Sequence, residues 1–153
     1  MIYSTACEYA IRALTVLAFE PSDEWVLRTT IAEAGDLPAP FMGKILKDLV
    51  RAGLLASVRG RGGGYRLARG ADEIRLIDIR AAIDGTGDLD SCAVGLDPCS
   101  DETPCPLHDD FRRVRETIRE YLVTTTLAQV ASGRRRKTEL LTGDDDLHGP
   151  SSS

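Results

Sequence analysis

Two short helical patterns joined by a tight turn, and followed at once by a glycine-rich hairpin, restrict the fold of this chain more than any other feature. Residues 30–34 have a helical pattern, and Gly35-Asp36-Leu37 ends it as a turn. Pro38 can open a second helix, because its missing N–H costs nothing in the first helical turn. Gly53 ends this helix, and the order helix, turn, helix is typical of a helix-turn-helix. The apolar face predicted for the second helix contains Phe41, Ile45, Leu46, Leu49 and Val50.

After the second helix, the period of the sequence changes to that of strands. Residues 55–58 and 65–67 are short strand-like runs on either side of the glycine-rich segment 59–64. They predict a β-hairpin, and a hairpin directly after a helix-turn-helix is a wing. The glycines do not form a nucleotide-binding loop, because they lie between two strands and no Gly-Lys-Ser/Thr sequence follows them.

Helices are also predicted on both sides of this unit. Thr5 as N-cap and Glu8 three residues later read as a capping box, which starts a helix that ends near Pro21. A short helix is predicted over residues 74–83, and a long one from Asp109 has a narrow apolar seam that favours dimerisation over packing on its own domain. The fold class is therefore mainly α: a winged helix-turn-helix with a small β-hairpin wing and a long C-terminal dimerisation helix. The predicted parts are a winged helix-turn-helix domain at 1–83, a cysteine loop at 84–108, a dimerisation helix at 109–132 and a basic-then-acidic disordered tail at 133–153.

Charge is distributed unevenly along the chain. A total of 19 Lys+Arg against 24 Asp+Glu gives a net charge of -5, which taken alone disfavours nucleic acid as a partner. Between Lys44 and Arg69, however, seven basic residues accompany one acid, a local charge of +6. Residues 84–110 carry eight acids and no Lys or Arg, a local charge of -8. The basic segment can therefore face phosphate groups, whereas the acidic one cannot.

Several classes of protein are excluded at this point. No apolar run approaches the roughly 20 residues that cross a bilayer, so no membrane is expected as a partner. The N-terminus carries neither a basic leader nor an apolar segment with a cleavage site, so a cytoplasmic protein with reduced cysteines is expected. No nucleophile–base pair and no pair of acids stands out, so the chain is not expected to be an enzyme.

The second helix and the wing supply the candidate DNA-binding residues. In this interpretation the N-terminal half of the helix enters the major groove, and its lysines bind phosphates. Glycines at the hairpin tip let the backbone approach a phosphate or a minor groove between two arginines. The alternative is an ordinary solvated helix face beside a hairpin tip with a few basic residues. The candidates are Thr29, Pro38, Ala39, Pro40, Met42, Gly43, Lys44, Lys47, Arg59, Arg61, Gly62 and Gly63.

The cysteine loop carries the chemistry of the sequence. Cys92, Cys99 and Cys105 follow the spacing Cys-x6-Cys-x5-Cys, and His108 stands three residues further on. Thiolates in a long loop without a regular pattern can close around iron or zinc, and the metal then orders the loop. The spacing matches neither structural zinc knuckles nor ferredoxins, so small buried hydrophobes or a redox disulfide pair remain alternatives. Cys7, in the first turn of a helix, is expected to be buried and inert.

Taken together, these residues resemble the Rrf-type winged-helix transcription regulators, a family that includes the IscR and NsrR iron-sulfur sensors. The resemblance covers roughly residues 1–132 and is most specific in the wing. The residues that carry it are 4–14 of the first helix, 37–46 around the second helix of the pair, 53–67 of the wing, Cys105-Pro106-Leu107-His108 and Thr125-Thr126-Leu127-Ala128.

The resemblance implies a homodimer that binds double-stranded DNA at a pseudo-palindromic operator and whose DNA affinity is controlled by an iron-sulfur cluster. Cys92, Cys99 and Cys105 match the cluster ligands of the family. His108 stands where the IscR-like branch, with a 2Fe-2S cluster, has its fourth ligand, whereas Glu8 stands near the acid used by the NsrR-like branch, with a 4Fe-4S cluster. We favour 2Fe-2S with His108, because this residue lies in the same loop as the cysteines. The alternative function is a cluster-free repressor that uses its thiols as a redox switch or responds to a small ligand.

Overall fold

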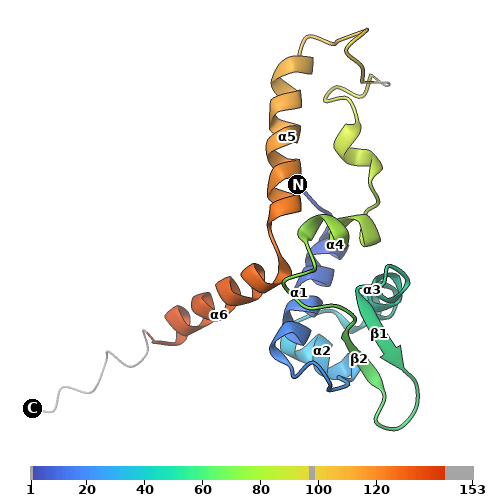
Figure 1. Ribbon diagram of the computed structural model, residues 1–153, viewed down its shortest axis with the longest axis vertical. Coiled ribbons are helices and arrows are strands. Elements are labelled where there is room, and N and C mark those ends of the chain that lie inside the picture. Colours follow the sequence, from blue (N-terminus) through green and yellow to red (C-terminus); the bar gives the residue numbers. More distant parts are fainter. Residues whose placement is uncertain (1, 97–98, 144–153) are drawn as a thin grey trace, which may run out of the picture.

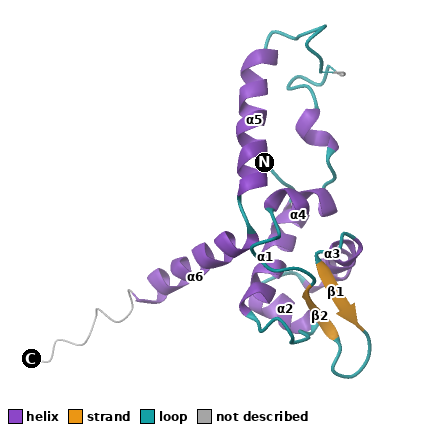
Figure 2. Ribbon diagram, viewed as in Figure 1, coloured by secondary structure: helices purple, strands orange, loops and turns teal. Residues whose placement is uncertain are grey.

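The computed structural model describes residues 2–96 and 99–143. It is mainly helical with one two-stranded antiparallel hairpin, which confirms the predicted fold class. Figure 1 shows the winged domain at one end, α5 rising from it as an arm and α6 leaving it in another direction; Figure 2 marks the hairpin. No described helix is long and apolar enough to span a membrane. In chain order the elements are α1 (Thr5–Phe19), α2 (Arg28–Gly35), α3 (Ala39–Arg51), β1 (Leu55–Val58), β2 (Gly64–Leu67), α4 (Leu76–Ile83), the 3-10 helix η1 (Gly87–Asp90), α5 (His108–Thr124) and α6 (Leu127–Gly143).

Helix α1 is the centre of the core. It packs against α2, α3, α4 and α6, so every helix of the winged domain shares its apolar surface with α1. Burial of these side chains is the main force that holds the short helices together, since helices of this length are marginal alone. The largest fully buried side chains are Leu14, Ile31, Met42, Leu46, Leu49, Leu54, Ile74, Leu76, Ile79, Leu122 and Leu127.

The buried face of α3 differs by one position from the predicted one. Met42 is completely buried, whereas Phe41 is 58% exposed. The buried residues Met42, Ile45, Leu46 and Leu49 follow the spacing of one helical stripe, and Phe41 lies at its edge against the ring of Tyr9. The prediction that Phe41 belongs to the core and that Met42 contacts DNA is therefore wrong, because Met42 has no exposed surface to offer.

The start of α1 is also capped differently. Ser4, with extended backbone angles, is the N-cap, and its Oγ accepts a hydrogen bond from the backbone N–H of Cys7 at 3.1 Å. The predicted N-cap, Thr5, is already the first helical residue. The Ser4 hydroxyl in turn donates to the carboxylate of Asp84, at the end of α4. The cap therefore links α1 to the first residue of the cysteine loop.

The predicted dimerisation helix is two helices. Thr125 is extended, and Thr126 and Gln129 form a capping box that starts α6: the Thr126 N–H donates to Gln129 Oε1 at 2.8 Å, and the Gln129 N–H donates to Thr126 Oγ1 at 3.3 Å. Leu127 then turns into the core. The predicted disordered tail is correspondingly wrong for residues 133–143, which are helical, while residues 144–153 lie outside the described part of the chain.

Candidate nucleic-acid interface and metal centre

The exposed face of α3 carries most of the predicted DNA-binding residues of this helix. Ala39, Pro40, Lys44 and Lys47 are exposed, and Pro38 and Gly43 are partly so. The Lys44 ammonium contacts the Asp48 carboxylate at 2.6 Å and remains 82% exposed. This hydrogen bond from Lys44, together with the charges around it, lowers the pKa of Asp48 below its usual range. Asp48 therefore stays ionised and orients Lys44 along the outer face of the helix.

Arg28, the first residue of α2, adds a cation that sequence reasoning missed. A Cβ atom at Gly43 would lie 3.5 Å from Nη1 of Arg28, so the guanidinium lies over α3 at its one position without a side chain. Thr29 is exposed beside it, and no side chain of the described residues caps the N-terminus of α2. Free backbone N–H groups and a positive helix end favour an anion here. Arg28 is recognised as part of this face because α2 approaches α3 closely. No local sequence pattern encodes this approach.

The wing holds its basic tip away from the core. Strands β1 and β2 form the predicted hairpin and pair antiparallel, with Leu55 opposite Leu67 and Val58 opposite Gly64. Arg59 and Arg61 are both exposed. Gly60 and Gly62 have φ of 92° and 70°, so the tip needs glycine at these positions.

Gly63 is buried and does not belong to the exposed tip. A Cβ atom there would lie 2.3 Å from the carbonyl oxygen of Val58. Its N–H donates to the carbonyl of Gly60, which closes the turn. The prediction that Gly63 contacts DNA is therefore corrected, since this glycine is needed for close packing within the hairpin.

The base of the wing is braced by a third extended segment. Val26 and Tyr65 exchange two backbone hydrogen bonds, at 2.9 and 2.8 Å, across an antiparallel bridge. Beside this bridge, the guanidinium of Arg66 lies 4.2 Å from the ring centroid of Trp25. The hairpin is thus attached to the helical domain at its base and free at its basic tip.

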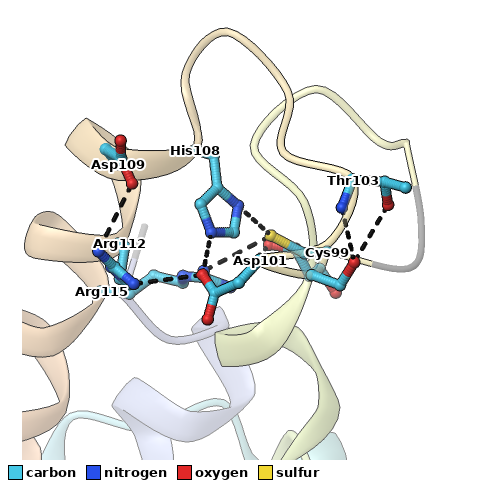
Figure 3. A network of polar contacts seen from close by, with 9 residues as sticks. Cys99, Asp101, Thr103, His108, Asp109, Arg112 and Arg115 are labelled. Atoms are coloured by element: carbon cyan, nitrogen blue, oxygen red, sulfur yellow. Dashed lines mark hydrogen bonds and ion pairs between the residues drawn. The ribbon is translucent and has the colours of Figure 1, made fainter.

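The four predicted loop ligands form two pairs. Cys92 Sγ lies 3.9 Å from Cys105 Sγ. Cys99 Sγ lies 3.4 Å from Nδ1 of His108, as Figure 3 shows. All three loop cysteines are in the reduced, thiol form. Within residues 2–96 and 99–143, no group of three or more His, Cys, Asp or Glu side chains converges as a metal site. The structure therefore brings the four predicted ligands together as two pairs, Cys92 with Cys105 and Cys99 with His108.

His108 is the first residue of α5 and is only 6% exposed. Its Nε2 lies 2.9 Å from Asp101 Oδ1, so the tautomer with a proton on Nε2 donates to this carboxylate and leaves the Nδ1 lone pair facing Cys99. Arg112 binds the same Asp101 oxygen at 3.2 Å (Figure 3). The hydrogen bond from His108, and then the charge of Arg112, lower the pKa of Asp101. Asp101 is thus an ionised acceptor that orients the imidazole.

Arg115 completes the surroundings of Cys99. Its Nη2 lies 3.6 Å from Cys99 Sγ, and its Nη1 donates to the carbonyl oxygen of Ser91 at 3.4 Å. A pocket of about 310 Å³ lies against this group, lined by residues of the loop and of α5. Sequence reasoning missed Asp101, Arg112 and Arg115. The sequence contains one signal for the two arginines: they are three residues apart, and this spacing places them on one face of α5.

Cys7 and Glu8 lie apart from these pairs. Cys7 is completely buried, as predicted, and burial, assisted by the charge of Asp84, raises the pKa of its thiol to about 12. Glu8 lies in the first turn of α1, where its charge acts on Cys7 and Tyr3. A role for Glu8 as a ligand therefore requires a second copy of the chain to bring it to the cysteine loop.

Residues 3–133 match the Rrf2 family, which is described as an iron-dependent transcriptional regulator. The chain belongs to the Rrf2 family. A candidate HTH-type transcriptional regulator of Mycobacterium tuberculosis is 39% identical to this Rrf2 protein over 134 residues, 87% of this chain and 83% of the relative. This Rrf2 protein is thus a DNA-binding transcriptional regulator and not an enzyme.

Two solved structures resemble this Rrf2 protein across most of its length. One is CymR, the global cysteine regulator of B. subtilis, with a TM-score of 0.70 and 29% identity, covering 84% of this chain and 95% of CymR. The other is T. potens IscR, with a TM-score of 0.67 and 28% identity, covering 86% of each chain. Rrf2 regulators bind DNA and are typically dimeric.

Proposed function

We propose that this Rrf2 protein is a homodimeric regulator whose affinity for a pseudo-palindromic operator is controlled by a 2Fe-2S cluster bound to Cys92, Cys99, Cys105 and His108. The observation that carries the proposal is the arrangement of these donors as two pairs. Two tetrahedral ligands at ~2.3 Å from one metal ion lie about 3.8 Å apart. The separations of 3.9 Å between the two sulfurs and 3.4 Å between sulfur and imidazole nitrogen are close to this value.

Two pairs suit a binuclear cluster better than a single ion. A structural zinc ion needs all four donors in one shell, and the described residues contain no such group. A 2Fe-2S cluster takes two protein donors at each iron, so each pair would hold one iron of a bound cluster. The donor types fit as well, because thiolate and imidazole are both ligands of such clusters.

His108 is the proposed fourth ligand. Asp101 accepts from Nε2 and thereby directs Nδ1 toward Cys99, the orientation that a metal-bound histidine needs. The bound cluster would supply electron transfer and reactivity toward oxidants or nitric oxide. NsrR-like ligation by Glu8, with a 4Fe-4S cluster, is the competing assignment within this proposal.

The DNA face proposed here is the outer side of α3, the start of α2 and the tip of the wing. A winged helix of this kind places its second helix in the major groove and a hairpin beside it. Lysine and arginine side chains there would bind phosphates, and the small residues would approach the bases. The residues that the structure leaves accessible for this role are Arg28, Thr29, Pro38, Ala39, Pro40, Gly43, Lys44, Lys47, Arg59, Arg61 and Gly62.

The dimer face proposed here is the outer side of α5. Leu107, Val114 and Tyr121 recur every seven residues and are all exposed. Phe111 and Ile118, between them, are partly buried and line a pocket together with residues 2–4 and Arg80 of α4. An exposed stripe with heptad spacing suits the same stripe of a second copy. Two copies would then present two α3 helices to two half-sites.

The chain itself provides a connection from the cysteine loop to the winged domain. Asp84 accepts a hydrogen bond from the backbone N–H of Ser4 at 2.9 Å, in addition to the bond from its hydroxyl. The buried Arg80 donates to the carbonyl oxygens of Ile2 and Gly85, both at 3.1 Å. Because α1 packs on α2 and α3, a change in the order of the loop would shift the start of α1 and with it the reading helix.

A cluster-free thiol switch is the second candidate. Cys92 and Cys105 are reduced neighbours with sulfurs 3.9 Å apart, and a disulfide requires them to approach to about 2.05 Å. The similarity to Staphylococcus aureus CymR, which has been solved in an oxidized form, supports this alternative. Oxidation would then cross-link the loop without any metal.

Anaerobic purification followed by spectroscopy and DNA-binding titration tests the proposal. We expect coloured protein with visible absorption, two iron and two sulfide per chain, and a change in operator affinity on loss of the cluster. Cys92→Ala should abolish the colour, whereas Cys7→Ala, which removes a thiol outside the loop, should retain it. Loss of the spectrum in His108→Ala but not in Glu8→Ala supports the histidine, and the reverse result selects the acid.

Colourless protein after anaerobic reconstitution with iron and sulfide, still able to bind DNA, would refute the cluster. A Cys92–Cys105 disulfide found by mass spectrometry after mild oxidation, with a matching change in DNA affinity, would then establish the thiol switch.

A further inference from the structure

The turn between α2 and α3 sets the position of the reading helix, and its carbonyl groups have an unusual set of partners. Asp36, with φ of 51°, ends α2 in the left-handed conformation. The chain itself satisfies two of the last carbonyls, since the Asp36 N–H donates to Glu33 at 3.1 Å and the Leu37 N–H donates to Ala32 at 2.8 Å. The carbonyls of Ala34 and Gly35 remain, and both accept from arginine side chains of other helices.

Arg12 of α1 is the first of these arginines. Its Nη2 donates to the carbonyl oxygen of Gly35 at 2.5 Å and to that of Asp36, and the same atom lies 3.6 Å from the Asp36 carboxylate. A guanidinium at the C-terminal end of a helix also meets the negative end of its dipole. Arg12 therefore holds the turn against α1.

Arg134 of α6 is the second. Its Nη2 donates to the carbonyl oxygen of Ala34 at 3.3 Å, and its Nη1 donates to the carbonyl oxygen of Arg12 at 3.5 Å. One side chain thus joins α6 to the end of α2 and to the residue that holds the turn. Along α6 the burial decreases toward the C-terminus: Leu127 and Ala131 are buried, Arg134 is half-buried, and residues 135–139 are exposed.

We propose that Arg134 is a positioning residue for DNA binding, which fixes the turn before α3 by capping the carbonyl end of α2 from α6. Arg12 and Arg134 together donate hydrogen bonds to the carbonyl oxygens of Gly35 and Ala34, the two that the backbone N–H groups of the turn do not satisfy. Docking of α6 and correct placement of the reading helix are thereby coupled. This role is independent of whether a cluster or a thiol pair controls the protein.

Arg134→Ala, with Arg136→Ala as the matched control, tests the proposal in the full-length chain. Both variants remove one arginine from α6, but Arg136 lies on the exposed part of the helix. We expect Arg134→Ala to lower operator affinity about fivefold or more, because two charge-assisted hydrogen bonds per subunit are lost. Amide hydrogen exchange at Asp36 and Leu37 should become faster in the same variant. The control should match the wild type in both measurements.

The salt dependence of binding separates positioning from direct contact. A residue that touches a phosphate contributes about 0.9 to the slope of log K against log salt, so the slope must stay unchanged if Arg134 only positions the turn. Arg134→Lys keeps the charge but not the two-branched donor, and we expect a smaller loss of affinity with the same slope. It also provides a folded variant if Arg134→Ala unfolds α6. Unchanged affinity and unchanged exchange at the turn, or a reduced salt slope, would overturn the proposal.

Discussion

Met42 and Phe41 are adjacent in α3, and truncating each of them tests which one belongs to the core. Met42 is completely buried within the cluster formed by α1, α3 and the neighbouring helices, so Met42→Ala removes packed atoms and leaves a cavity. Such a change costs about 2–5 kcal/mol of the free energy of unfolding. Phe41 is 58% exposed, and its main ring contact is with Tyr9 at a centroid distance of 6.2 Å. Losing that contact costs about 0.5–1.5 kcal/mol.

Urea unfolding followed by circular dichroism measures both values. Protein concentration must be the same for all variants, because association would add to the apparent stability. Equal m-values would show that the two variants expose similar surface on unfolding, so that their midpoints can be compared. We expect Met42→Ala to be less stable than Phe41→Ala by at least about 1 kcal/mol. An equal or larger loss in Phe41→Ala would show that the face of α3 described here is wrong.

Three further predictions concern Cys7, the tip of the wing and the cap of α6. In reduced, cluster-free protein at pH 8, iodoacetamide should leave Cys7 unmodified until the protein is unfolded, since its pKa of about 12 keeps the buried thiol protonated; rapid native labelling seen by mass spectrometry would contradict this. The double variant Arg59→Ala/Arg61→Ala should weaken binding to all DNA sequences and reduce the salt slope by about 0.9 per lost phosphate contact, whereas Arg69→Ala, beyond the tip, should do neither in the same titrations. Thr126→Ala should lower the free energy of unfolding by about 0.5–2 kcal/mol through loss of the α6 cap, and no change in urea unfolding would argue against the capping box.

The fold of residues 28–67 was predictable because its signals are local. Helical spacing, the turn at Gly35 and the glycine-rich tip each require only neighbouring residues, and all three lie where they were expected. The one-position error in α3 has a physical reason: Phe41 and Met42 are both apolar, and periodicity alone does not decide which lies at the edge of a stripe. The environment decides it, because the ring of Tyr9 provides a partner for Phe41 outside the core.

The end of α5 was missed for a different reason. Thr126 and Gln129 carry the local signal for a new helix, but the apolar spacing continues across them and favours one long helix. Tertiary contacts settle the competition: the Leu76 N–H donates to the Thr125 carbonyl at 3.0 Å, and the Leu127 N–H donates to the Ile74 carbonyl at 2.8 Å. These bonds hold the chain extended between the helices, and they come from the start of α4 and the segment just before it, far away in the sequence.

The candidate ligands of the cysteine loop were predictable by residue type, but their pairing was not. Loop residues separated by thirteen positions, as Cys92 and Cys105 are, meet only through the path of the chain. The orientation of His108 likewise depends on Asp101, which is one of many acids in the loop and has no distinguishing local pattern.

The acids of the cysteine loop acquire a specific role from their partners on α5. Asp90 binds Arg119 at 2.6 Å, and Asp101 binds Arg112 at 3.2 Å, so residues that read as one block of negative charge form ion pairs along the arm. Both pairs are largely exposed, and water screens such pairs strongly, so they guide the loop to α5 without holding it firmly. Metal binding to thiolates can contribute on the order of 10 kcal/mol to the order of a segment. Under the proposed function, the occupancy of the thiols therefore outweighs the ion pairs in deciding the order of the loop, which is the property that a sensor needs.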